Sequence, residues 1–167
     1  HIFYMSEGQM KIHNDSLMGI DPKKKTVLSS CFSSEDMLLM SELRKKTKNK
    51  KFAIIDGKGG WHTEAKGIKP SIEYAESNNI EYDVIKTETH HEMLHLLSDY
   101  KGLINKPIID DTCPRVTIEA KLMGLEVILD EMSQHITEEW WKQTPGKIIK
   151  YLSSRPKLFW ETVKCLK

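Results

Sequence analysis

The chain has 167 residues, 39% hydrophobic and 29% charged, with a formal net charge of +1. This length and composition suit one globular domain or parts of two. A charge so near zero excludes a strong overall field for nucleic acid, and no apolar run approaches the roughly 20 residues of a transmembrane helix. Three dispersed cysteines without a C-x-x-C pair favour a reducing compartment, so we expect a cytoplasmic protein.

The first 50 residues predict short elements separated by loops. An apolar stretch at His1–Met5 precedes Ser6, which we expect to cap a brief helix ending near His13. A strand is predicted over residues 26–29. Ser34 is predicted to cap the next helix, because two acidic residues follow it in the first turn. A basic run over residues 44–51 is then predicted to be a linker.

From residue 52 onward, strand patterns alternate with helix patterns of ten to twelve residues. Such alternation predicts an α/β fold, with a Rossmann-like parallel sheet and helices on both of its faces. In sheets of this kind, ligands bind beyond the carboxyl ends of the strands. The tail over residues 137–167 is predicted to be wholly helical. The expected strands are 52–56, 81–86, 102–105 and 126–129, and the expected helices are 67–77, 89–100 and 114–124.

The most informative stretch is residues 110–124, a polar loop that leads into a helix. Pro114 suits a first helical turn, and the free amides beside it, together with the helix dipole, favour a phosphate or diphosphate. On a helical wheel Glu119 falls among apolar neighbours, where a carboxylate is costly unless a polar group meets it. Asp111 lies in the loop, eight residues before Glu119. The pattern therefore predicts two acids flanking an anion site.

These motifs resemble the donor-binding, C-terminal half of retaining glycosyltransferases with the GT-B architecture, the group 1 family. That half has a Lys-Gly pair that opens a helix, and here Lys66-Gly67 occupies that place. It also has two acids separated by seven residues, the second of which is the glutamate of E-A-x-x-x-G, and here Asp111, Glu119 and Gly124 match this pattern. Residues 2–13 resemble the end of the family's N-terminal half, and residues 27–32 resemble its crossing segment.

The resemblance implies roles for individual residues. Lys66 would bind the diphosphate of a nucleotide sugar, and Asp111 would meet hydroxyls of the transferred sugar, which makes these two the catalytic candidates. Glu119 would accept hydrogen bonds from the ribose hydroxyls. Amides around Thr112, Cys113 and Arg115 would stabilise the departing diphosphate. A carboxylate suits a vicinal diol, and fixed donors suit a leaving group that gains charge.

The chain departs from the family's pattern at two places. The first acid of the pair is usually glutamate, and Asp111 is one methylene shorter. The arginine expected after the first strand of this half is replaced by a glycine-rich loop that begins with Gly57 and Lys58. Lys58 or Arg115 would then supply the missing positive charge near the donor.

The resemblance also implies the organisation and the partners. Residues 1–50 would hold the end of the N-terminal half and the crossing segment, residues 51–136 the nucleotide-sugar-binding domain, and residues 137–167 a helical tail packed on it. The donor would be a nucleotide-diphosphate sugar, and the acceptor a glycan or a lipid-linked sugar. An N-terminal half would complete the enzyme. We expect no metal or other cofactor, no nucleic acid, and at most weak contact with a membrane surface.

Two other functions compete with this interpretation. His91, Glu92 and His95 form a literal H-E-x-x-H, the zinc motif of metallopeptidases, with Glu119 as a conceivable third ligand. Thr89 and Glu92 also form a T-x-x-E capping box, which gives Glu92 a structural role, and the wheel turns both histidines toward water. We therefore expect no zinc here. The second rival is a non-catalytic nucleotide-binding module of the same fold.

Overall fold

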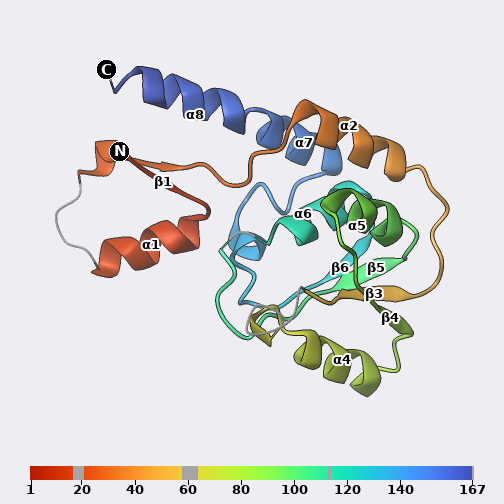
Figure 1. Cartoon of the computed structure of the whole chain (residues 1–167). Coiled ribbons are helices and arrows are strands. Elements are labelled where there is room, and N and C mark those ends of the chain that lie inside the picture. Colours follow the sequence, from red (N-terminus) through yellow and green to blue (C-terminus); the bar gives the residue numbers. More distant parts are fainter. Residues whose placement is uncertain (17–20, 58–63, 113, 167) are drawn as a thin grey trace.

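The computed structural model describes residues 1–16, 21–57, 64–112 and 114–166. It confirms the expected α/β architecture with a parallel sheet (Figure 1). The four strands lie in the order β4-β3-β5-β6, and each pairs in parallel with its neighbours. Their bounds are Phe52–Ile55 for β3, Tyr82–Ile85 for β4, Gly102–Ile104 for β5 and Glu126–Ile128 for β6.

Helices cover both faces of this sheet, as predicted. Helix α4 (Ile68–Ser77) packs on one face, while α5 (His90–Leu97) and α6 (Arg115–Leu122) lie on the other (Figure 1). Helix α4 ends where Asn79 takes a left-handed conformation, and α6 ends the same way at Gly124. In both cases the next amide bonds back to the third-last helical carbonyl, which is the pattern of a Schellman motif. After each of these helix ends, the chain turns back to the sheet and forms the next strand.

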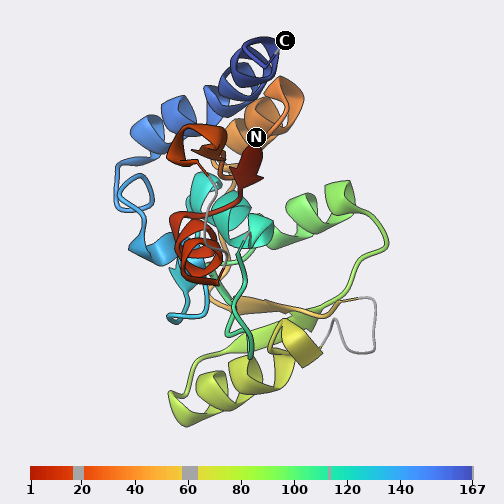
Figure 2. The same cartoon turned by 90° about the vertical axis from the view of Figure 1, so that its left-hand side faces the viewer.

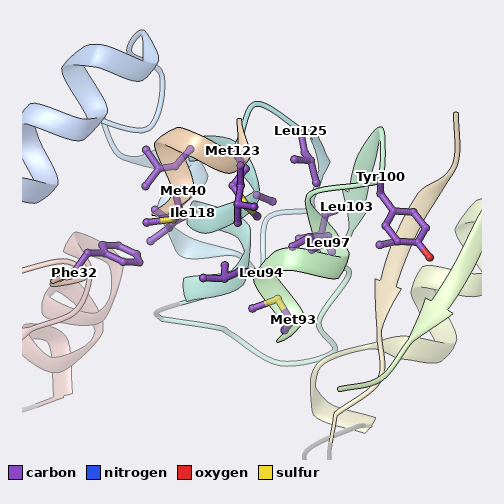
Figure 3. Packing of buried hydrophobic residues seen from close by; sticks show 14 of the residues in the cluster. Phe32, Met40, Met93, Leu94, Leu97, Tyr100, Leu103, Ile118, Met123 and Leu125 are labelled. Carbon is purple, nitrogen blue, oxygen red and sulfur yellow. The ribbon is translucent and has the colours of Figure 1, made fainter. Parts of the chain in front are cut away.

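Two apolar clusters follow from this layering. The smaller lies between α4 and the sheet around Phe52, Ile54 and Ala75. The larger lies on the opposite face, where α5 and α6 meet the sheet on one side and α2 (Ser34–Leu43) and α7 (Pro145–Ser153) on the other (Figure 3). Helix α6 is buried on nearly all sides, because helices pack on it as well as the sheet. The side chains of α6 are therefore fixed in position by this packing.

The N-terminal segment forms a second, smaller sheet. Strand β1 (Ile2–Tyr4) pairs in parallel with β2 (Lys25–Val27), and α1 (Glu7–Ser16) and the short helix η1 (Pro22–Lys24) lie between them in the chain. Helix α1 runs three residues past its predicted end. Helix α2 (Ser34–Leu43) follows. The predicted cap at Ser34 is wrong, because the Ser33 hydroxyl accepts the Asp36 amide instead.

The tail is helical only in part. The helix η2 (Gln134–Thr137) is followed by turns over residues 138–144, then by α7 (Pro145–Ser153) and α8 (Arg155–Lys164). The expectation of a continuous helix from residue 137 is therefore wrong. Pro145 favours a new helix start, and the turns before it bury Trp140 and Trp141. Helices α2, α7 and α8 gather on the side away from α4 (Figures 1 and 2). Across the described ranges, none of the helices combines the length and apolarity needed to cross a membrane.

Candidate functional site

Lys66 and Asp111, the two catalytic candidates, meet at the carboxyl edge of the sheet. The Lys66 Nζ lies 2.6 Å from Asp111 Oδ2, although the two residues are 45 positions apart in the chain. Lys66 is 53% exposed, whereas Asp111 is 11% exposed. The backbone of Asp111 is fixed by hydrogen bonds to Met132 and Gln134. The aspartate is thus anchored, and the lysine reaches it from the solvent side.

Gly67 explains how Lys66 reaches this place. Its φ of +73° lies in the left-handed region, which favours glycine. A Cβ on Gly67 would lie 1.6 Å from the carbonyl oxygen of Lys106, in the loop after β5. The same loop is bonded to α4, because the Lys106 amide donates to Ser71 Oγ over 3.0 Å. The start of α4 therefore lies directly against the loop that leads to Asp111.

Glu119, the predicted ribose-binding acid, is buried as expected, with its side chain 2% exposed. His90 Nε2 lies 2.9 Å from Glu119 Oε1, and a guanidinium nitrogen of Arg115 lies 3.6 Å from the same oxygen. Burial raises the pKa of this carboxyl, and the hydrogen bond from His90 and the charge of Arg115 only partly oppose that rise. The fold thus keeps an acid where its charged form is disfavoured.

The two partners of Glu119 are themselves half exposed. His90 begins α5, and its ring reaches across to α6, while Arg115 begins α6 and also lies over the Phe32 ring. Neither partner is locked inside the core. Both partners therefore present part of their surface to solvent beside the buried carboxylate. His90 was not predicted as a site residue, because its contact with Glu119 spans 29 positions of the chain.

Gly57 lies in a pocket beside this pair. The pocket has a volume of about 340 Å³ and lies at the carboxyl ends of β3 and β4. Its walls include Asp56, Gly57, Thr87 and His90, so the imidazole that touches Glu119 also lines the pocket. The position agrees with the expectation that ligands bind at this edge of the sheet.

The other predicted site residues are distributed around this edge. Thr112 lines a second pocket, on the side of the N-terminal segment. Arg115 follows Pro114, which is the residue just before α6 rather than its first helical residue. The structure therefore brings together Lys66 with Asp111, and Glu119 with Arg115. Lys58 and Cys113 lie outside the described residues.

The H-E-x-x-H segment has the structural role that the capping box predicted. The Thr89 hydroxyl accepts the Glu92 amide, and the Glu92 carboxylate accepts the Thr89 amide. The rings of His91 and His95 lie 4.5 Å apart, and His91 is exposed. Within the described ranges, no three or more histidine, cysteine, aspartate or glutamate side chains gather where they could hold a metal ion.

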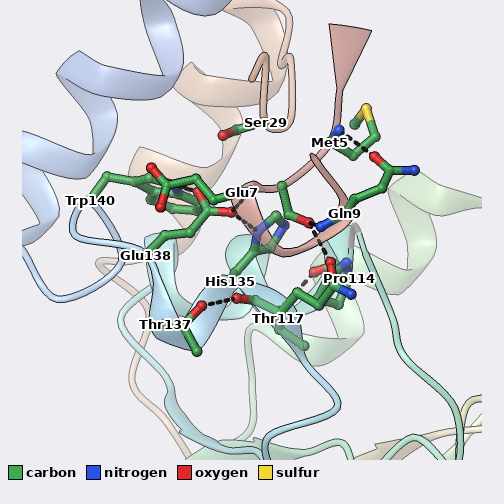
Figure 4. A network of polar contacts seen from close by, with 12 residues as sticks. Met5, Glu7, Gln9, Ser29, Pro114, Thr117, His135, Thr137, Glu138 and Trp140 are labelled. Atoms are coloured by element: carbon green, nitrogen blue, oxygen red, sulfur yellow. Dashed lines mark hydrogen bonds and ion pairs between the residues drawn. The ribbon is translucent and has the colours of Figure 1, made fainter. Parts of the chain in front are cut away.

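A second buried carboxylate, which the sequence did not reveal, joins the N-terminal segment to the rest of the fold (Figure 4). Glu138 accepts the Glu7 amide over 3.2 Å and the indole N–H of Trp140, and His135 Nδ1 lies 3.6 Å from it. We call this cluster the N-terminal clamp. It consists of Ser6, Glu7, Gln134, His135, Glu138 and Trp140, and it also contains a hydrogen bond from Ser6 Oγ to Gln134 Oε1.

Comparison with known proteins adds no family. Neither the known protein families nor the curated proteins contain a match to this chain. The site therefore rests on its own geometry and on the motif resemblance.

Proposed function

We propose that this chain is the donor-binding part of a retaining glycosyltransferase, which transfers a hexose from a nucleotide-diphosphate sugar to a glycan or a lipid-linked acceptor. One observation supports this proposal above the others. Lys66 and Asp111, chosen from a motif resemblance, lie 2.6 Å apart at the sheet edge where ligands of such folds bind. The buried Glu119 lies in the helix that follows the same loop.

The Lys66–Asp111 pair suits the leaving group. In the reaction, the anomeric carbon loses its bond to the diphosphate, whose oxygen takes the electron pair. The acceptor oxygen forms the new bond to that carbon, and its proton passes to the departing diphosphate. The exposed Lys66 ammonium is free to turn from Asp111 toward the diphosphate and to stabilise the developing charge. Asp111, anchored through its backbone, then accepts hydroxyls of the sugar.

Glu119 suits the ribose. Both described contacts to its carboxylate, from His90 and Arg115, reach the oxygen Oε1. A vicinal diol offers two hydroxyl donors to a carboxylate, which can accept several hydrogen bonds. A buried carboxylate whose pKa is raised by burial costs stability in its charged form, so its presence here favours a role in binding.

The remaining parts of the proposal come from the resemblance. These are retention at the anomeric carbon, the need for an N-terminal half that completes the enzyme, and an enzyme that works in the cytoplasm or at a membrane surface. On this view, the chain alone binds donor but transfers poorly. A non-catalytic nucleotide-binding module would bind the same ligands and would show no turnover even when an N-terminal half is supplied.

A thermal-shift screen of nucleoside diphosphates and nucleotide sugars tests the proposal. A ligand held at 100 times its Kd stabilises the fold by about 2.7 kcal/mol, which gives a visible shift for a domain of this size. We expect binding by at least one nucleotide sugar, a loss of at least tenfold in Lys66→Met and Glu119→Gln, and little change in Lys69→Met. Lys69 is the matched control, since it lies on the exposed face of α4. If no nucleotide binds, or if both site variants bind normally, the proposal fails.

A further inference from the structure

A larger pocket lies between the N-terminal segment and the loop that carries Asp111. Its volume is about 490 Å³, which suits a molecule the size of a sugar with a substituent. One wall comes from β1 and α1, and the other from the loop residues on either side of Asp111. The residues that define what we call the N-terminal pocket include Ile2, Phe3, Ile12, His13, Asp110 and Thr112.

The walls of this pocket are held together by buried polar contacts. The N-terminal clamp joins the start of α1 to η2 through pairs separated by 128 and 131 positions of the chain. Gln134, a member of the clamp, also lines the pocket. On the opposite wall, the buried Tyr4 is hydrogen-bonded through its hydroxyl to His13 Nδ1. The N-terminal pocket is therefore a feature that the fold maintains, rather than an accidental gap between loosely packed segments.

The lining selects a particular chemistry. Ile2, Phe3 and Ile12 offer an apolar surface, whereas His13, Asp110 and Thr112 offer polar groups. The carboxylate of Asp110 disfavours an anion and accepts hydrogen bonds from hydroxyl groups. A neutral molecule with several hydroxyls at one end and an apolar body at the other satisfies both parts of the lining.

We propose that the N-terminal pocket binds the acceptor, and that this acceptor is a glycoside with an apolar aglycone, such as an alkyl or lipid chain. The inference rests on the proposed function. Asp110 and Thr112 are the immediate neighbours of Asp111, so a sugar hydroxyl bound between them lies beside the place proposed for the transferred sugar. The apolar aglycone then lies against Ile2, Phe3 and Ile12.

Binding of short glycosides tests this inference without any donor. Matched pairs of n-octyl and methyl glycosides of glucose, galactose and mannose are titrated into the whole chain by calorimetry, below the micelle concentration. We expect at least one octyl glycoside to bind tenfold or more tightly than its methyl counterpart. Ile12→Asn is expected to remove most of that difference, and Asp110→Ala to weaken both members of the pair.

Two matched controls identify the place of binding. Leu96→Asn changes an exposed apolar residue on α5, and Glu131→Ala changes an exposed acid of a turn, so neither is expected to alter the titrations. Equal affinity for octyl and methyl glycosides, or octyl binding that survives Ile12→Asn, overturns the inference. Nucleotide binding is measured on the same samples. Glycoside binding without nucleotide binding overturns the proposed function instead, and nucleotide binding without glycoside binding overturns only this inference.

Discussion

Two regions of the molecule each contain a buried carboxylate, and the two carboxylates have different kinds of hydrogen-bond donors. Glu119, in α6, is met by His90 and Arg115, which are side chains that remain half exposed. Glu138, in the N-terminal clamp, is met by a backbone amide and by the indole of the buried Trp140. Both acids are almost completely covered. Burial alone therefore does not distinguish an acid that binds a ligand from an acid that holds the fold together.

The difference lies in the donors. The donors of Glu138 belong to the core and the backbone, and a ligand cannot replace them without unfolding that part of the chain. Of the two donors of Glu119, His90 lines a pocket and Arg115 is half exposed, so a hydroxyl group can share or replace them. We infer that Glu138 contributes mainly to stability and that Glu119 contributes mainly to binding. Four predictions test this contrast, from the largest expected effect to the smallest.

Removal of the clamp carboxylate is expected to have the largest effect. Glu138→Ala leaves the Glu7 amide and the Trp140 indole N–H without their acceptor, so we expect the free energy of unfolding to fall by about 3 kcal/mol. Urea denaturation measures this change. The control is Glu139→Ala, because that neighbour is exposed and pairs on the surface with Lys142 at 3.2 Å. Equal stability of the two variants would show that the clamp does not hold the fold.

The backbone under the proposed donor site is expected to be the next most sensitive point. Gly67 has a left-handed backbone conformation, and Gly67→Ala places a Cβ against the Lys106 carbonyl oxygen. We therefore expect the free energy of unfolding to fall by on the order of 2 kcal/mol. Gly146→Ala, within α7, meets nothing within 4 Å and is expected to stabilise by about 0.5 kcal/mol. Thermal denaturation of both variants compares them. A Gly67→Ala variant as stable as Gly146→Ala would contradict the close packing described.

Replacement of the site carboxylate is expected to cost little stability and to change its dependence on pH. Since burial raises the pKa of Glu119, the folded state binds more protons than the unfolded state between the ordinary and the raised pKa. The wild-type free energy of unfolding therefore contains a component that falls as pH rises through that window. Glu119→Gln lacks this component, so its stability relative to wild type is expected to increase as pH rises through that window.

Urea denaturation of wild type and Glu119→Gln at a series of pH values from 4 to 8 measures this difference. Glu126→Gln provides the control, because Glu126 is exposed and pairs with Lys101 on the surface. A relative stability of Glu119→Gln that declines as pH rises would have the opposite sign and would mean that the fold favours the charged carboxylate.

The Lys66–Asp111 ion pair is expected to have the smallest effect on stability. Because Lys66 is half exposed, water and salt weaken the attraction, and we expect a coupling energy of about 0.5 kcal/mol or less. A double-mutant cycle with Lys66→Met and Asp111→Asn measures it by urea denaturation. A coupling energy of several kcal/mol would indicate a structural ion pair, and would weaken the proposal that Lys66 turns toward a diphosphate.

Local patterns in the sequence predicted the sheet and its helices well. All four strands lie within a residue or two of their predicted bounds, because each is a short apolar run between clear turn signals. The burial of Glu119 followed from its place on the helical wheel. The turns over 138–144 were missed, since Trp140 and Trp141 fit a helical pattern as well as a turn that buries them.

The contacts that define the site were harder to predict. The approach of His90 to Glu119 depends on how α5 and α6 lie against each other, and no local pattern encodes that arrangement. The same is true of Glu138, whose donor at Glu7 comes from the other end of the chain. A useful signal was present in both cases, namely a polar residue at the start of a helix or within an otherwise apolar segment. Its partner became visible only in three dimensions.

The span of the N-terminal clamp also bears on the order in which the chain folds. A contact between Glu7 and Glu138 closes a loop of 131 positions, and the entropy of that closure must be lost before the contact contributes anything. In the four-stranded sheet the paired strands close shorter loops, and the longest of these, between Phe52 and Gly102, spans 50 positions. We therefore expect that sheet to form first and the first sixteen residues to dock last. The same residues would then be the earliest to detach, exchanging their amide hydrogens while the parallel sheet is still intact.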